Sequence, residues 1–132
     1  MWSNDQGETW SDPGPTEFAS PTSPMSMKRM PPDGRRGGGD LLAVWNDHSG
    51  RFALDAERGR QPLTSAISQD EGKSWTNHKL VESDLSRGYH YTAIYFVGDH
   101  VLLAYCAGPK GTGRQLNTLR TRRIPRKWFY ET

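Results

Sequence analysis

Short apolar or alternating segments, each bounded by polar turns, recur along the chain. Residues 25–30 alternate between methionine and polar side chains, and a period of two is typical of a strand. Residues 41–45 form a continuous apolar run, which favours a buried strand. Residues 63–67 and 75–81 lie on either side of a polar turn. The pattern therefore predicts four strands between residues 25 and 81.

A second, shorter group of strands is predicted from residue 89 onward. Residues 91–97 and 100–106 are strand-like and are joined by a Gly-Asp dipeptide, which favours a tight hairpin turn. We predict a third strand over residues 116–124, ended by a proline. The aromatic run at residues 128–130 is either a fourth strand or a tail that docks on the sheet.

Polar stretches rich in proline or glycine separate these segments. Residues 13–24 contain prolines at four positions, too many for a central strand. Residues 46–62 are polar and irregular and predict a long loop. Residues 107–115 predict a glycine-rich loop, which lacks the Gly-Lys-Ser/Thr ending of a phosphate-binding loop. Linkers and short strands therefore account for the whole chain.

One of the polar turns occurs twice. Residues 68–75 read Ser-Gln-Asp-Glu-Gly-Lys-Ser-Trp, and residues 3–10 read Ser-Asn-Asp-Gln-Gly-Glu-Thr-Trp. Both fit the pattern Ser-x-Asp-x-Gly-x-Ser/Thr-Trp. A motif that returns after one sheet's length of chain indicates a repeat architecture.

The motif makes physical sense as a tight turn between two strands. Asp70 is placed to accept backbone N–H groups of its own turn, as aspartates do in Asx-turns. Gly72 supplies the positive φ that such a turn needs. Ser68 would end one strand, and Trp75 would fold its ring into the core beneath the turn. The first copy offers the same groups in Ser3, Asp5, Gly7 and Trp10.

This repeated turn resembles the Asp-box of the sialidase and BNR-repeat superfamily. There it is a structural device between the third and fourth strands of a β-propeller blade. The resemblance implies an all-β fold, a partial β-propeller of about two and a half four-stranded antiparallel blades from a parent with six. On this interpretation residues 1–12 end a truncated blade, residues 25–81 form a complete blade, and residues 89–132 form the last blade. We therefore expect the chain to be a C-terminal fragment.

The resemblance also implies a substrate-binding arginine. In sialidases an arginine just before the third strand of the next-to-last blade holds the sialic acid carboxylate, and Arg60 matches that place. Arginine suits this task because its planar guanidinium stays charged and pairs bidentately with a carboxylate. Arg51 and Arg58 remain alternatives in the same loop.

The catalytic residue implied by the resemblance is Tyr91. Residues 91–94 read Tyr-Thr-Ala-Ile and resemble the family's segment that begins with its catalytic tyrosine, with threonine in place of serine. A tyrosine nucleophile is unusual among glycoside hydrolases. It suits an anionic sugar because a carboxylate nucleophile would be repelled by the substrate's own carboxylate. Tyr89 and Tyr95 flank it, so an ordinary aromatic at a strand start is the alternative. His90 is expected to face away from Tyr91 and to be structural.

The function implied is that of an exo-α-sialidase-like glycoside hydrolase, which releases terminal sialic acids from glycoconjugates. The family's other arginines and its acid/base aspartate and glutamate would lie in earlier blades. We therefore expect the missing N-terminal blades as partners, a sialic-acid-like glycan as substrate, and no activity from this chain alone. The alternatives are a non-catalytic propeller that binds a glycan or a protein, and a related enzyme for another sugar.

Composition and charge disfavour some classes of binding partner. The chain has 132 residues, 14 glycines, 9 prolines and a formal net charge of +2, so it has no strong field that would favour nucleic acid or membrane. No apolar run reaches transmembrane length. The single cysteine, Cys106, is expected to be a free thiol buried in a strand, and we expect no metal site and no cofactor. No signal peptide is visible, and export of the parent stays open.

The remaining ionisable residues predict no further chemistry. The histidines show no metal-ligand spacing; they are His48, His78, His90 and His100. Acidic residues in the loop before Arg60 are interpreted as solvated charges; they are Asp47, Asp55 and Glu57. The basic residues between positions 120 and 127 are interpreted as the solvated face of a strand.

Overall fold

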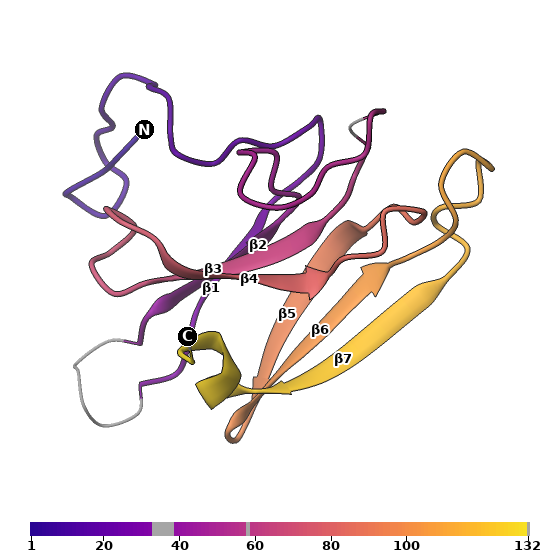
Figure 1. Ribbon diagram of the computed structural model, residues 1–132. Coiled ribbons are helices and arrows are strands. Elements are labelled where there is room, and N and C mark those ends of the chain that lie inside the picture. Colours follow the sequence, from indigo (N-terminus) through magenta and orange to yellow (C-terminus); the bar gives the residue numbers. More distant parts are fainter. Residues whose placement is uncertain (33–38, 58, 132) are drawn as a thin grey trace.

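The computed structural model describes residues 1–32, 39–57 and 59–131, and in this part of the chain seven strands form two antiparallel sheets (Figure 1). The first sheet has the order β1 (Ser26–Arg29), β2 (Leu41–Trp45), β3 (Leu63–Ser68) and β4 (Thr76–Glu82). The second has the order β5 (His90–Val97), β6 (His100–Cys106) and β7 (Leu119–Pro125). The predicted all-β fold is confirmed, and the predicted strands form with small shifts at their ends. Consecutive antiparallel strands in each sheet agree with partial propeller blades.

The two ends of the chain lie outside the sheets. The aromatic run after β7 is not a fourth strand but a short 3₁₀ helix, η1 (Arg126–Phe129), so the second sheet has three strands. The described residues 1–24 contain no strand, and residues 1–12 are the segment expected to end a truncated blade. The reason is that no other described strand lies beside them, and a lone hairpin is marginal in water.

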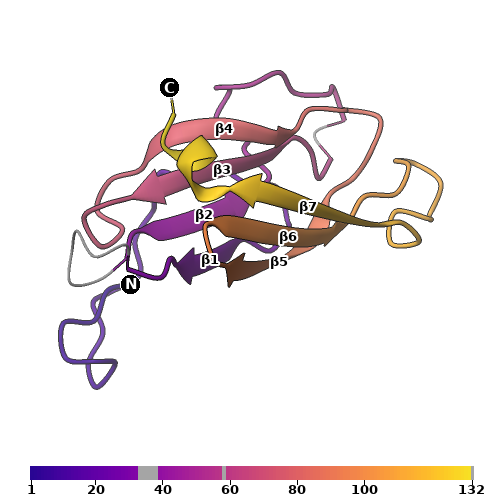
Figure 2. The same ribbon diagram turned by 90° about the horizontal axis from the view of Figure 1, so that it is seen from below.

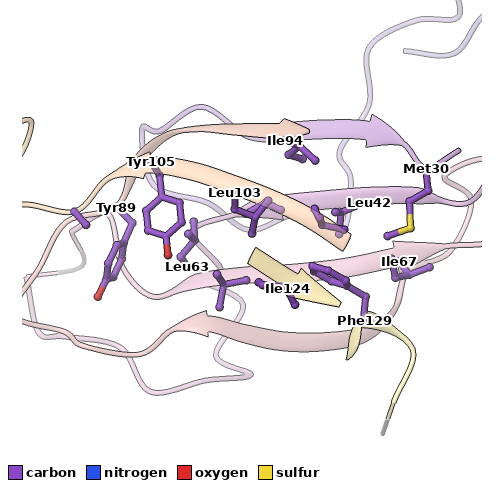
Figure 3. Packing of buried hydrophobic residues seen from close by; sticks show 14 residues of the cluster. Met30, Leu42, Leu63, Ile67, Tyr89, Ile94, Leu103, Tyr105, Ile124 and Phe129 are labelled. Atoms are coloured by element: carbon purple, nitrogen blue, oxygen red, sulfur yellow. The ribbon is translucent and has the colours of Figure 1, made fainter. Parts of the chain in front are cut away.

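The main hydrophobic core lies between the two sheets, which pack face to face (Figure 3). The first sheet contributes Leu42 and Ile67, and the second contributes Leu103 and Ile124, all nearly inaccessible to solvent. Phe129 of η1 completes this core, so the tail is docked. A Lys79 ammonium lies 4.4 Å from the ring centroid of Trp128 and adds a cation–π contact to the docking.

The first sheet is buried on its second face as well, which explains the unbroken apolar run of β2. Leu42 and Val44 point into the main core, whereas Ala43 and Trp45 belong to a smaller cluster on the opposite face. The N-terminal segment covers that face and contributes Phe18, whose ring centroid lies 4.8 Å from that of Trp45. This segment is the indigo chain that runs above the first sheet in Figure 1.

Side chains, not a continuous hydrogen-bond ladder, join the two sheets. Strand β1 lies beside β5, as Figure 2 shows from below, and Lys28 Nζ donates to the carbonyl of Ile94 at 3.0 Å. At the opposite edge Arg120 Nη1 lies 2.7 Å from a carboxylate oxygen of Glu82. The Tyr105 hydroxyl donates to the other oxygen of Glu82. The sheets are therefore tied at both edges around the core.

The outward face of the second sheet carries apolar side chains that are exposed to solvent. Tyr95, Val97 and Leu119 are exposed. Cys106 is a free thiol, as expected, but it is only half-buried because it points to this outward side of β6, opposite the buried Tyr105. Within the described ranges, no helix is long and apolar enough to cross a membrane.

Candidate functional site

The Asp-box at residues 68–75 closes the β3–β4 connection by hydrogen bonds within itself. Ser68 Oγ donates to Asp70 Oδ1 at 2.9 Å and accepts the N–H of Gly72 at 2.8 Å. The Ser74 hydroxyl donates to Asp70 Oδ2 at 2.6 Å, and its backbone N–H donates to Oδ1 at 2.9 Å. These bonds, led by those from Ser74, lower the pKa of Asp70 to about 2. The carboxylate is therefore committed to the turn.

The Asp-box at residues 3–10 has the same internal network but a different tryptophan. Asp5 accepts the hydroxyl and the N–H of Thr9, and the pKa of Asp5 is likewise lowered to about 2. Trp10 is 60% exposed, and its indole donates to the carbonyl of Gly7 at 3.0 Å. Trp75 of the second box is only 8% exposed and packs against Phe18. Both boxes are scaffolds, and neither presents a group for chemistry.

Three loops meet where β3 and β5 begin, and they form the candidate site. The backbone N–H of Tyr89 donates to the carbonyl of Arg60 at 2.8 Å, which ties the loop before β3 to the start of β5. Gly88 N–H donates to the carbonyl of Gly108 at 3.1 Å. Lys110 pairs with Asp55, so the glycine-rich loop is tied to the long loop as well. The backbone of the site is thus fixed from three directions.

Arg60 and Tyr91 lie together in this site. The guanidinium carbon of Arg60 is 5.6 Å from the centroid of the Tyr91 ring, within range of a cation–π contact. Arg60 Nη1 lies 2.9 Å from Nδ1 of His90. Among the described residues no carboxylate pairs with Arg60. The two residues that the sequence resemblance singled out are therefore neighbours, and the arginine keeps an uncompensated charge.

Tyr91 has an unusual backbone for a residue inside a strand. Its φ is +55°, in the left-handed region that tyrosine rarely adopts. The pairing of β5 with β6 shifts register between His90 and Ala93, as it does at a β-bulge. A left-handed conformation costs a residue with a side chain about 1–2 kcal/mol. Strain of this kind gathers at functional sites, where it re-aims a side chain.

The bulge overturns the expectation that His90 faces away from Tyr91. The two rings are 5.9 Å apart between centroids, and both contact the guanidinium of Arg60. Regular alternation predicts opposite faces, but the left-handed Tyr91 breaks that alternation. His90 therefore adjoins the candidate site. Its position directly before a strand-opening tyrosine was the only sequence signal that could have pointed to it.

The competing arginines are less suited to hold a ligand, as far as the structure describes them. Arg51 Nη1 lies 2.9 Å from a carboxylate oxygen of Asp47, and that aspartate is almost fully buried. Arg51 is therefore engaged in holding the loop. Arg58 lies outside the described residues. Asp55 and Glu57 are not free loop charges either, because both pair with Lys110.

The competing tyrosines are also distinguished by their surroundings. Tyr89 is buried, and burial raises its pKa to about 12, with further raising by the nearby Glu82 and Asp84. Tyr95 is exposed, but it lies on the outward face, 5.6 Å from the Lys28 ammonium and not beside Arg60. Tyr91 is 59% exposed and touches Arg60. Of these three phenols, Tyr91 alone is both exposed and next to Arg60.

A tyrosine–glutamate pair does exist in the molecule, but not at this site. The hydroxyl of Tyr105 donates to Glu82, and Arg120 pairs with the same carboxylate. Burial, followed by Glu82, raises the pKa of Tyr105 strongly, so this phenol is not poised to ionise. The sequence offered no signal for it, because the pair joins two sheets. In the described part of the chain, no group of three or more His, Cys, Asp or Glu residues could hold a metal ion.

Comparison with known proteins gives one match. The family model for BNR repeat-like domains matches residues 1–103, which is most of the chain and includes both Asp-boxes, Arg60 and Tyr91. No curated protein matches the chain, and no solved structure matches it.

Proposed function

Because the chain belongs to the BNR repeat-like domain family, we propose that it forms part of a sialidase-like glycoside hydrolase that releases terminal sialic acids from glycoconjugates. Arg60 binds the carboxylate of the sugar, and Tyr91 is the nucleophile. The observation that carries this proposal is an arginine that pairs with no carboxylate among the described residues and lies 5.6 Å from an exposed tyrosine ring.

Arg60 has the donors that a carboxylate needs. A guanidinium has five N–H groups, and the only one with a hydrogen-bond partner among the described side chains is on Nη1, which faces His90. The free N–H groups can form the two parallel bonds by which arginine grips a carboxylate. Half-burial of Arg60 lowers the local dielectric, which strengthens the pairing relative to a fully solvated arginine.

Tyr91 has the access and the position of a nucleophile. Its oxygen attacks the anomeric carbon, the bond from that carbon to the leaving oxygen breaks, and the phenolic proton passes to a base. The guanidinium beside the ring binds the carboxylate of the sugar and so holds the sugar next to the phenol. No described carboxylate hydrogen-bonds to the Tyr91 hydroxyl. We therefore assign the base, and the acid that protonates the leaving group, to blades outside this chain.

The missing base is also the observation that favours a second candidate function, a non-catalytic propeller that binds an acidic glycan. In that case Arg60 and Tyr91 would form a carboxylate-binding and stacking surface. Tyrosine faces stack on sugars without any need for proton transfer, so the geometry described here serves this role too. Turnover separates the two candidates.

The first experiment measures N-acetylneuraminic acid binding to the full chain by NMR. A charge-assisted hydrogen bond contributes about 1.5–3 kcal/mol, so Arg60→Gln should weaken binding by roughly tenfold or more. The affinity of Arg60→Lys should lie between those of the unaltered chain and Arg60→Gln, because lysine keeps the positive charge but cannot form two parallel hydrogen bonds to a carboxylate. Arg114→Gln, an exposed arginine on the glycine-rich loop, is the matched control and should bind like the unaltered chain. Equal affinity in Arg60→Gln and the control would remove Arg60 from the site.

The second experiment separates hydrolase from binder. A sialoside with a fluorescent leaving group is given to a protein that carries this chain together with the remaining blades. Turnover that Tyr91→Phe abolishes supports the hydrolase. Binding without turnover supports the non-catalytic alternative, and turnover unchanged in Tyr91→Phe contradicts the role of this tyrosine.

A further inference from the structure

His90 lies beside Arg60 in the candidate site, and its hydrogen bond to Arg60 is one in which donor and acceptor can be identified. The ring is only 7% exposed, and its Nδ1 lies 2.9 Å from Nη1 of Arg60. Arginine has donors and no acceptor, and it stays protonated. Nδ1 must therefore be the acceptor, and the ring proton of neutral histidine must be on Nε2. The contact assigns both the charge state and the tautomer of His90.

The space around Nε2 fits this assignment. A Cβ added to Gly88 would stand 2.7 Å from His90 Nε2 and 2.9 Å from the side-chain oxygen of Gln115, so a glycine at this position leaves room for the ring. Among the described residues Nε2 has no hydrogen-bond partner of good geometry, and the Gln115 side chain lies close enough to act on the pKa of the ring. An amide oxygen on this side suits an N–H and not a bare nitrogen.

A neutral acceptor can orient the Arg60 guanidinium without neutralising its charge, which a carboxylate cannot do. A carboxylate in the place of His90 would orient the guanidinium, but it would also neutralise it and compete with an incoming anion. The imidazole orients the same group and leaves its charge uncompensated. The contrast within the molecule is direct, because Arg29, Arg51 and Arg120 all pair with carboxylates.

We propose that His90 is the positioning residue of this site: the neutral Nε2–H tautomer holds the Arg60 guanidinium beside Tyr91, and protonation of the ring releases it. A proton on Nδ1 would remove the acceptor and set two cations side by side. The site is then assembled at neutral pH and loosened in acid. Only the identity of the ligand rests on the proposed function; the coupling of His90 to Arg60 does not.

The groups that face His90 make the direction of the pH response clear. Among the described residues they are Arg60 from the loop before β3, Tyr91 from β5 itself and Gln115 from the glycine-rich loop, and of these Arg60 is the charged one. Burial, followed by the charge of Arg60, lowers the pKa of His90 below its ordinary value of 6.5, while Gln115 acts the other way. Release therefore requires a pH below 6.5.

The direct test uses the full chain and needs no ligand. Two-bond ¹H–¹⁵N spectra of the imidazole should show the Nε2–H tautomer at pH 7.5 and a midpoint below 6.5. Arg60→Gln should raise that midpoint, because the neighbouring cation is gone, whereas Arg114→Gln should leave it unchanged. A neutral Nδ1–H tautomer, or a midpoint that Arg60→Gln does not move, would overturn the proposal.

The ligand test adds a readout that a purely structural role would not move. N-acetylneuraminic acid binding should be about tenfold weaker one pH unit below the midpoint that the spectra give for His90, with the sugar carboxylate still ionised above the ordinary carboxyl pKa of about 3.5. His90→Asn keeps an acceptor oxygen but does not titrate, so its affinity should stay level down to that pH. His90→Phe should bind weakly at every pH. A pH dependence that survives in His90→Asn would contradict the assignment.

The two proposals can fail separately. Absence of sialic acid binding at any pH, with the tautomer and the Arg60-dependent midpoint both observed, would remove the proposed function and leave the coupling of His90 to Arg60 in place. Binding that depends on Arg60 but not on the protonation of His90 would support the proposed function and contradict the role of His90 as the positioning residue.

Discussion

The two Asp-boxes are nearly identical inside and differ in everything around them. In both, the serine oxygen accepts the glycine N–H, at 2.7 Å in the first and 2.8 Å in the second. Both glycines have positive φ, +96° at Gly7 and +84° at Gly72. The second box joins two paired strands, however, while the first joins none among the described residues. Trp10 is mostly exposed, and Trp75 is buried.

The difference shows that the motif forms its turn without help from a sheet. Its hydrogen bonds run between residues at most four apart, so the network closes locally wherever the sequence occurs. Membership of a sheet is decided by the flanking residues, which supply apolar side chains on both sides of the second box. An Asp-box therefore predicts a turn, whereas the flanking segments determine whether that turn joins two strands of a blade.

The largest expected difference between the boxes lies in their tryptophans. Trp75→Ala should lower the free energy of unfolding by about 3–5 kcal/mol, because it empties a buried site next to Phe18 and Trp45. Trp10→Ala should change it by less than about 0.5 kcal/mol, since the ring is exposed. Urea denaturation measures both. Equal losses would mean that the first box belongs to the same cooperative unit as the sheets.

A smaller difference is expected for the glycines. Alanine at either position is strained by roughly 1–2 kcal/mol because φ is left-handed. At position 72 the new Cβ would also stand 3.1 Å from the Trp2 ring. Gly72→Ala should therefore lower global stability, whereas Gly7→Ala should disturb only its own turn. Amide hydrogen exchange would show this directly, with faster exchange spread over β3 and β4 in the first variant alone.

The smallest difference appears only in acid. The pKa of both aspartates is lowered to about 2, from an ordinary value of 3.8. Between these values the unfolded chain binds more protons, so the stabilisation is complete above 3.8 and is lost as the pH falls through about 2. NMR should find both carboxyl groups titrating near 2. Asp70→Asn should flatten the acid limb of the stability curve, and an equal flattening in Asp5→Asn would contradict the comparison.

The strands were predictable because their signals are local. The apolar run of β2 and the hairpin between β5 and β6 appear in the structure where the sequence placed them. The fate of the aromatic tail was not predictable, since an aromatic run fits either a strand or a docked helix. Contacts with remote residues decided it: the Tyr130 hydroxyl donates to Asp40, 90 positions earlier in the chain.

The candidate site was predictable only through family resemblance, and only in part. Arg60 and Tyr91 were singled out from short segments, and the structure brings them together. His90 was placed on the wrong side because the prediction assumed a regular strand. Left-handed backbone is usually announced by glycine or asparagine, and here a tyrosine adopts it, so the sequence carried no warning. Bulges at residues of this kind are set by the surrounding packing.

The docking of η1 has a consequence for how the chain can be divided. Although there are two sheets, there is one core between them, and Phe129, from the end of the second sheet, is part of it together with Met30 from the end of β1. Each sheet buries its inner face only against the other. The blades are therefore not independent modules: a boundary placed between Glu82 and His90, however natural it looks in the topology, would divide this shared core and expose its apolar side chains to water.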